Sequence, residues 1–453
     1  MGISLTTDQV LALAPDASSA AAGKKLANAK PWRNLGQNSE ALWGECQGSA
    51  LYQVKIDLSS MTIQCSCPSR KFPCKHSLGL LLLAVAIPSA APISEPPEWV
   101  TAWLAKRQAQ AASKQREAKE TPATTKTNSG PSTSRATRAE KRRELVAQGL
   151  ERLDLWLSDL VRNGLASVES QPATFWEQQA AQMIDAQAPG IAARLRSMAG
   201  IPNSSPRWPE ELLGQLGRLA LLTEAYHQGE RLEAALQEDV RRLIGWTLDQ
   251  DEVAARGERI TDDWLILGQV TGEEEDGSRG SKAGKQRVRM QRTWLLGTQT
   301  GRTALVLQFS AVGASFPEVY PLGTCQVADV LFWPGACPQR GRIEKRHGAW
   351  RAIQEPLPGA TTVDAFFAGV ATALARQPWL ERFLCALQQV VPVCSNDRWY
   401  IRDNSGTALP LTRGSHWKLL ALSGGAAVDC AGEWDGETLL PLGVLVDGTY
   451  HLL

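Results

Sequence analysis

The chain has 453 residues with 48 basic and 47 acidic side chains, so its formal net charge is only +1. This balance excludes a global field that would draw the protein to nucleic acid or to a membrane, and any such preference must come from a local patch. A hydrophobic fraction of 43% and a charged fraction of 21% are ordinary for a soluble protein, and the length suggests about two to four domains.

The cysteines and the apolar segments indicate the compartment. Nine cysteines, odd in number and unevenly spaced, argue against a disulfide framework. No basic segment followed by an apolar one opens the chain, so no secretory signal is predicted. The longest apolar run, residues 78–87, is about half of the ~20 residues that span a bilayer. We therefore expect a cytoplasmic protein without membrane contact, in which clustered cysteines bind metal rather than pair.

The first predicted module is a small ββα unit. Polar and apolar residues alternate over residues 51–58 and 61–64, which predicts two strands joined by a turn at Ser59-Ser60. A mostly apolar helix follows over residues 77–87 and is ended by Pro88. We expect a finger core at about residues 42–88 inside an N-terminal domain of residues 1–104.

Four potential metal ligands lie between the second strand and the helix: Cys65, Cys67, Cys74 and His76. Zinc prefers thiolate sulfur and imidazole nitrogen in a tetrahedron, and four such residues within twelve positions can surround one ion. Four protein ligands leave no open position for water. The predicted cofactor is therefore one structural Zn²⁺ that folds the module rather than activating a substrate.

The pattern Cys-x-Cys-x6-Cys-x-His after a strand pair and before an apolar helix resembles the SWIM zinc finger of bacterial proteins. The resemblance is specific over about residues 30–90 and matches all four ligand positions. It implies a DNA-binding or protein–protein interaction module. Bacterial relatives look like accessory components that work with MoxR-type AAA+ ATPases and von Willebrand factor A proteins, which this resemblance implies as partners.

Three basic residues stand beside the ligands: Arg70, Lys71 and Lys75. They favour the thiolate forms of the cysteines and compensate the negative charge of the metal centre. A rigid basic knuckle can equally contact the phosphates of a nucleic acid. Both interpretations stay open at the level of the sequence, and these residues are candidate nucleic-acid contacts.

A basic segment separates this domain from a helical one. Residues 105–145 hold eleven lysines and arginines against four glutamates, a net charge of +7. Residues 121–137 are rich in Thr, Ser, Pro and Gly, and the basic stretch 105–137 is predicted to be a low-complexity linker. Apolar residues at spacings of three and four then predict a helical bundle over residues 138–248.

The C-terminal part, residues 249–453, is predicted to be mainly antiparallel β-structure. Its expected strands are residues 264–268, 288–295, 304–309 and 417–422, with one helix near residues 362–376. Neither a phosphate-binding loop nor a nucleophile elbow nor a metalloprotease helix is found in the sequence.

The chain is thus predicted to be an α+β multidomain protein and not an enzyme. The function hypothesis is a zinc-binding interaction module for nucleic acid, protein or both, acting as an accessory subunit of a larger assembly. The alternative hypothesis is an enzyme with an unrecognised active site in the C-terminal β-rich region.

Overall fold

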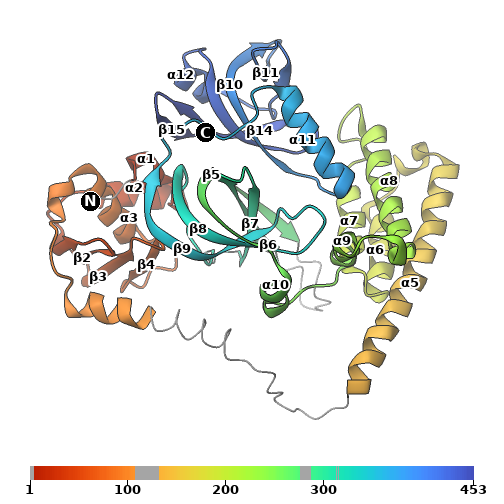
Figure 1. The fold of residues 1–453 in the computed structure, drawn as a ribbon, viewed down its shortest axis with the longest axis horizontal. Coiled ribbons are helices and arrows are strands. Elements are labelled where there is room, and N and C mark those ends of the chain that lie inside the picture. Colours follow the sequence, from red (N-terminus) through yellow and green to blue (C-terminus); the bar gives the residue numbers. More distant parts are fainter. Residues whose placement is uncertain (1–4, 108–131, 276–286, 313, 315) are drawn as a thin grey trace.

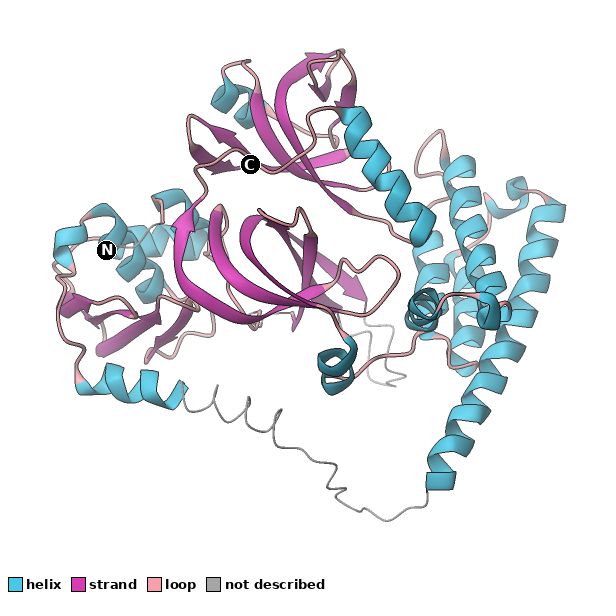
Figure 2. Cartoon of the chain, viewed as in Figure 1, coloured by secondary structure: helices cyan, strands magenta, loops and turns pink. Residues whose placement is uncertain are grey.

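The computed structural model describes residues 5–107, 132–275, 287–312, 314 and 316–453. It has four parts: an N-terminal module, a helical bundle, a curved sheet between them, and a C-terminal sheet with its own helices (Figure 1). Helices and strands are segregated in the way of an α+β protein (Figure 2), which confirms the predicted fold class.

The N-terminal module is a four-stranded antiparallel sheet in the order β1-β2-β3-β4 covered by helices. The strands are β1 Trp32–Gln37, β2 Ala41–Gln47, β3 Leu51–Asp57 and β4 Thr62–Cys65, and the helices are α1 Thr7–Ala12, α2 Ala17–Leu26, α3 Lys75–Ala86 and the short η1 Pro88–Ala90. Strands β1 and β2 enlarge the predicted ββα unit. Helix α3 is buried over most of its length because α2 covers it, and the two helices touch where Gly23 faces Leu78 and Gly79 faces Leu26.

A further helix, residues 98–107, packs on the same module. Its Val100 and Leu104 are buried against Ala41 and Trp43 of β2. The predicted linker of residues 105–137 therefore begins inside helical structure, and helix α5 already starts at Ser132. Residues 108–131 lie outside the described residues.

The helical bundle buries a continuous apolar core between long helices. Its elements are α5 Ser132–Asn163, η2 Leu165–Val168, α6 Ala173–Asp185, α7 Pro189–Met198, α8 Trp208–His227, η3 Gly229–Arg231 and α9 Ala234–Ile244. The short helix α10 Gln250–Arg256 follows them and lies against the curved sheet described next (Figure 1). Leu150, Leu153 and Leu157 of the predicted apolar stripe are all buried. This agrees with the helical periodicity of the sequence.

The curved sheet is antiparallel with the strand order β7-β6-β5-β8-β9. Its strands are β5 Arg259–Glu275, β6 Arg287–Gly297, β7 Thr303–Ala311, β8 Thr324–Phe332 and β9 Gly341–Ala352. The backbone N–H of Leu305 donates to the Gln339 carbonyl at 2.7 Å, so strand β7 reaches the residues just before β9. The sheet therefore nearly closes on itself (Figure 1).

The C-terminal sheet has the order β12-β11-β10-β13-β14-β15. Its elements are α11 Val363–Arg376, β10 Phe383–Ser395, β11 Arg398–Arg402, β12 Ala408–Pro410, α12 Trp417–Ser423, β13 Val428–Trp434, β14 Leu439–Val446 and β15 Thr449–Leu452. Helix α11 agrees with the predicted helix near residues 362–376.

The predicted strand at residues 417–422 is wrong, because these residues form α12. The segment Lys418 to Leu422 consists of good helix formers. Gly424 follows with a φ of 59°, the left-handed conformation that ends many helices. Residues 417–422 form an apolar run without strict alternation, and such a run fits a helix as well as a strand.

Both faces of strand β5 are buried over residues 264–268, against different parts of the molecule. Trp264 and Ile266 belong to a core shared with the N-terminal module. Leu265 and Leu267 belong to a second core shared with the C-terminal sheet. This explains the nearly continuous apolar run in the sequence, because a strand covered on both sides needs no polar alternation.

A buried carboxylate holds the curved sheet to the C-terminal sheet. Glu433 on β13 has only 1% of its side chain exposed. Its oxygens accept hydrogen bonds from the guanidinium groups of Arg292 at 2.8 Å and Arg382 at 2.9 Å and from the Trp294 indole at 2.7 Å. We call these four residues the Glu433 cluster.

The N-terminal module is joined to the curved sheet by hydrogen bonds as well as by the shared core. The Gln9 side-chain amide donates to the Gly323 carbonyl at 2.7 Å, and the Gln326 amide donates to the Ser59 carbonyl at 2.9 Å. Gln9 and Gln326 are both almost fully buried. The N-terminal module is therefore held against the curved sheet by these contacts, and not only by the chain segment that follows it.

Candidate metal centre

The four predicted ligands converge in the structure. One ligand atom from each of Cys65, Cys67, Cys74 and His76 lies within 4.8 Å of the others. The Nδ1 atom of His76 is 3.8 Å from the Cys65 sulfur and 4.0 Å from the Cys74 sulfur. Zinc bonds of about 2.3 Å to sulfur and about 2.1 Å to nitrogen give tetrahedral edges of roughly 3.6–3.8 Å, so these residues fit one Zn²⁺ with little adjustment.

Each ligand is placed by an element of secondary structure. Cys65 ends strand β4, whose register with β3 pairs it with Val54. Cys67 lies in the loop that follows. Cys74 is the N-cap of α3, and His76 is the second residue of that helix. The short spacing of the ligands suffices because the end of β4 and the start of α3 face each other across a nine-residue loop.

Backbone and hydroxyl groups around the sulfurs favour thiolates. Backbone N–H groups of Cys67, Ser69 and Ser77 donate to the sulfurs of Cys65, Cys67 and Cys74 respectively. The Ser77 hydroxyl is 3.3 Å from the Cys74 sulfur. N–H···S bonds at a helix start stabilise negative sulfur, which is the form that binds metal.

The thiols are also coupled to one another. A hydrogen bond from Cys65 lowers the pKa of Cys74 to about 3, and the same bond together with burial raises the pKa of Cys65. Burial also raises the pKa of Cys67. Three sulfurs at this separation repel one another when all are negative, and a Zn²⁺ between them would offset that charge.

The candidate nucleic-acid contacts do not form one uniform cluster. Arg70 and Lys75 are exposed, and within the described residues neither has an ion-pair partner. Lys71 instead pairs with Asp16 at 2.8 Å and donates to the Ser18 hydroxyl at 3.0 Å, both at the start of α2. These contacts leave the binding role of all three residues a prediction.

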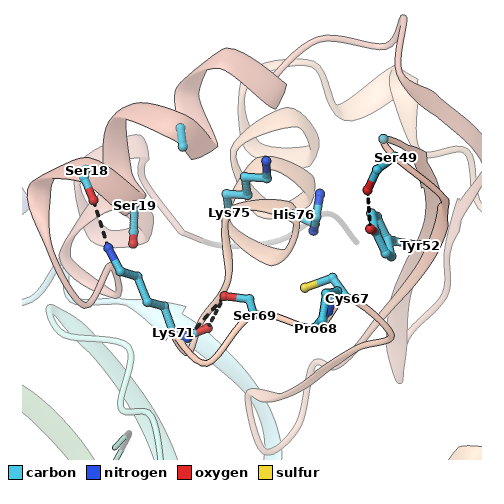
Figure 3. A pocket seen from close by; sticks show the side chains of 12 residues that line it. Ser18, Ser19, Ser49, Tyr52, Cys67, Pro68, Ser69, Lys71, Lys75 and His76 are labelled. Atoms are coloured by element: carbon cyan, nitrogen blue, oxygen red, sulfur yellow. Dashed lines mark hydrogen bonds between the residues drawn. The ribbon is translucent and has the colours of Figure 1, made fainter. Parts of the chain in front are cut away.

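A cleft opens directly beside the metal ligands (Figure 3). Its volume is about 400 Å³, and its walls come from α2, the β2–β3 turn, the ligand loop and the start of α3. Cys67, Lys71, Lys75 and His76 all contribute to these walls. The metal centre therefore has one side turned toward an accessible space.

Sequence reasoning missed the aromatic residues that support the finger. Trp99 and Trp103 lie on the helix of residues 98–107, and the Lys55 ammonium is 5.5 Å and 5.6 Å from their rings. Arg107 on the same helix pairs with Asp57 at 3.3 Å. The signal was available, because Trp99, Val100, Trp103 and Leu104 follow a helical period after Pro96-Pro97.

Comparison with known protein families finds two matches. Residues 52–84 match the family described as SWIM zinc finger, and residues 141–244 match the SWIM-associated four-helix bundle domain. Neither the curated proteins nor the solved structures contain a match to the chain. The chain therefore carries a SWIM zinc finger with one structural Zn²⁺ site, followed by the helical domain that accompanies such fingers.

The structure also bears on membrane association. Within the described residues, every helix is too short or too polar to cross a bilayer.

Proposed function

We propose that this chain is a cytoplasmic, non-catalytic interaction protein whose zinc finger contacts the phosphate backbone of nucleic acid without reading its sequence. The observation that supports this most directly is the pair Arg70 and Lys75. Both are exposed, neither has an ion-pair partner among the described residues, and both are attached to backbone that the metal ligands hold in place.

The expected mode of contact follows from the side chains. Arginine and lysine on a fixed loop meet phosphate oxygens, which are the same at every base pair. Lys71 joins them only by giving up its contact with Asp16. With two or three phosphate contacts, log K should fall with log salt concentration with a slope of about −2.

The role that we propose for zinc in this function is structural. A set of three cysteines and one histidine occupies all four tetrahedral positions, so the ion offers no site for a reactive water. We therefore propose no catalytic role for the finger.

The test is salt-dependent binding of a fluorescent 20-base-pair duplex by the full chain. Arg70→Gln and Lys75→Gln should each weaken binding and make the salt slope less steep by about 1. Arg413→Gln, which removes an exposed arginine between β12 and α12, is the matched control and should change nothing. Binding that does not respond to salt, or that responds equally to all three substitutions, would contradict the proposal.

We also propose that the protein is an accessory subunit with a protein partner, as the resemblance to bacterial SWIM-finger proteins implies. The supporting observation is helix α11, which has no charged residue between Asp364 and Arg376. Phe367 on this helix is 36% exposed, and a neighbouring side of the helix, with Phe366, Gly369 and Val370, borders a cleft of about 680 Å³. An uncharged helix face beside a cleft is typical of a docking surface.

The partner expected from the resemblance is a MoxR-type AAA+ ATPase, a von Willebrand factor A protein or both. Affinity purification from the native host should recover one of these proteins with the wild-type chain and lose it with Ala368→Glu on α11. Ala220→Glu, at an exposed position of α8, is the control and should leave recovery unchanged. Recovery of the same ATPase or von Willebrand factor A protein with all three chains would exclude α11 as the docking surface.

A further inference from the structure

The cleft beside the metal centre has the composition of an anion site. Its walls contain the ammonium groups of Lys71 and Lys75, hydroxyl groups such as those of Ser49, Tyr52 and Ser69, and the ring of His76, and they contain no carboxylate. Figure 3 shows these side chains surrounding one space, with Lys75, His76 and Tyr52 along one wall. Ammonium and hydroxyl donors in walls without a carboxylate favour a ligand that accepts hydrogen bonds.

His76 places a donor in this wall. The side that bears Nδ1 faces the sulfurs of Cys65 and Cys74, so Nδ1 is the metal-binding atom. His76 is only 5% exposed, it nevertheless lines the cleft, and Nε2 has no hydrogen-bond partner among the described residues. A neutral imidazole that binds metal through Nδ1 must carry its proton on Nε2, so this atom is a fixed N–H donor.

Tyr52 fixes the direction of that donor. The Tyr52 ring lies 4.9 Å from the His76 ring at an interplanar angle of 33°. The Tyr52 hydroxyl is in turn 2.6 Å from the Ser49 hydroxyl, which anchors the tyrosine to the β2–β3 turn. The imidazole cannot rotate freely, because the metal ligands hold one edge and the phenol covers one face.

The charges around the cleft suit a singly charged ligand. A Zn²⁺ with three thiolates and a neutral imidazole carries one net negative charge, which the free Lys75 offsets. The charge of Lys71 is matched by that of Asp16, 2.8 Å away. The surroundings are then close to neutral but rich in donors, which favours a monoanion over a dianion.

We propose that this cleft binds one phosphodiester group, with the His76 Nε2–H and the Lys75 ammonium as its charge-recognising donors. The inference rests on the proposed contact with nucleic acid. It places one phosphate of the nucleic-acid backbone in this cleft. Tyr52 is a positioning residue, because it acts by orienting His76.

Metal binding and phosphodiester binding are then linked. Zn²⁺ fixes both the tautomer and the position of His76, so the donor exists in its aligned form only in the metal-loaded finger. By thermodynamic linkage, a bound phosphodiester must raise the affinity for zinc by the same factor by which zinc raises the affinity for the phosphodiester.

The decisive variant is His76→Cys in the full chain. A fourth thiolate preserves a tetrahedral zinc site but removes the Nε2–H donor. Zinc content, measured by plasma mass spectrometry, should stay at one per chain, while affinity for the labelled duplex should fall about tenfold, the change expected from losing one charge-assisted hydrogen bond. Arg413→Gln, at an exposed position outside the cleft, is the control and should leave the affinity for the duplex unchanged.

Two outcomes separate this inference from the proposed function. If His76→Cys retains zinc and binds the duplex as tightly as the wild type, while Arg70→Gln weakens binding, the cleft assignment is overturned and the proposed function stands. If no duplex binds but dimethyl phosphate shifts the His76 Nε2–H signal in a long-range ¹H–¹⁵N spectrum, the proposed function fails and the phosphodiester site stands. A phosphoserine peptide that shifts this signal when dimethyl phosphate does not would overturn the choice of a diester.

Discussion

The zinc centre and the Glu433 cluster are both buried polar centres, but they are encoded in opposite ways. The zinc ligands lie within twelve positions of one another, between Cys65 and His76. The partners of Glu433 lie as far away as Arg292, 141 positions along the chain. A local centre can be read from spacing, whereas a centre assembled by the tertiary fold leaves no local pattern.

The comparison extends to how each centre contributes to stability. The zinc site joins a strand end to a helix start inside one small module, which has few other means of fixing its loop. The Glu433 cluster joins two sheets that already share an apolar core. Loss of the zinc ligands should therefore unfold one module, and loss of Glu433 should weaken an interface.

The largest effect is expected from removing zinc ligands. Cys65→Ser combined with His76→Ala should abolish zinc binding, because two of four ligands are gone. Hydrogen exchange should then show lost protection in β3, β4 and the first turn of α3, with the helices α6 to α8 unchanged. Cys46→Ala removes a buried cysteine outside the ligand set and should keep one zinc per chain. Full protection of β3 and β4 without zinc would show that the metal is not structural.

A smaller effect is expected at the second centre. Glu433→Ala leaves Arg292, Arg382 and the Trp294 N–H without their acceptor, and should lower the free energy of unfolding by about 3 kcal/mol. Urea unfolding followed by tryptophan fluorescence measures this change. Zinc content should remain at one per chain, and a loss of zinc would contradict the independence of the two centres.

The smallest effect is expected at Asp262, and it depends on pH. Burial opposes ionisation, but hydrogen bonds from Thr300 and Gln299 outweigh it and lower the pKa of this carboxyl. A lowered pKa in the folded state stabilises the protein above the ordinary value of about 3.9, and this contribution disappears as pH falls through the folded-state pKa.

Asp262→Asn should therefore cost about 1–2 kcal/mol at pH 7, and this cost should shrink as pH falls below about 3.9. The measurement is urea unfolding of both proteins across this range. Thr261→Ser, next to it in β5, is a control whose effect should not vary with pH in the same way. A cost that stays constant down to pH 3 would show that Asp262 acts through packing and not through its charge.

The elements that could be predicted are those whose signal is local. The ligand set, α3, α11 and the apolar stripe of α5 all follow from spacing or period over fewer than about twenty residues. The metal-ligand geometry agreed with the sequence because a strand end and a helix start are both rigid. Strand β3 was likewise predictable, because polar and apolar residues alternate over residues 51–58 and this signal is local.

The elements that escaped prediction depend on contacts distant in sequence. Strand β1 pairs with β2 through a register shift between Arg33 and Gly36, which breaks the alternation a strand usually shows. Helix α12 was misassigned because an apolar run of six residues fits either state. The walls of the cleft beside the metal centre come from α2, the β2–β3 turn and the ligand loop, which only the fold brings together.

The core that the finger shares with Trp264 and Ile266 of the curved sheet has a practical consequence for dissecting the protein. A fragment ending near residue 104 would present to water the apolar surface that these side chains normally cover, even with zinc bound. Such a fragment is expected to aggregate or to bind nonspecifically. The smallest piece suited to binding studies therefore includes the curved sheet together with the finger.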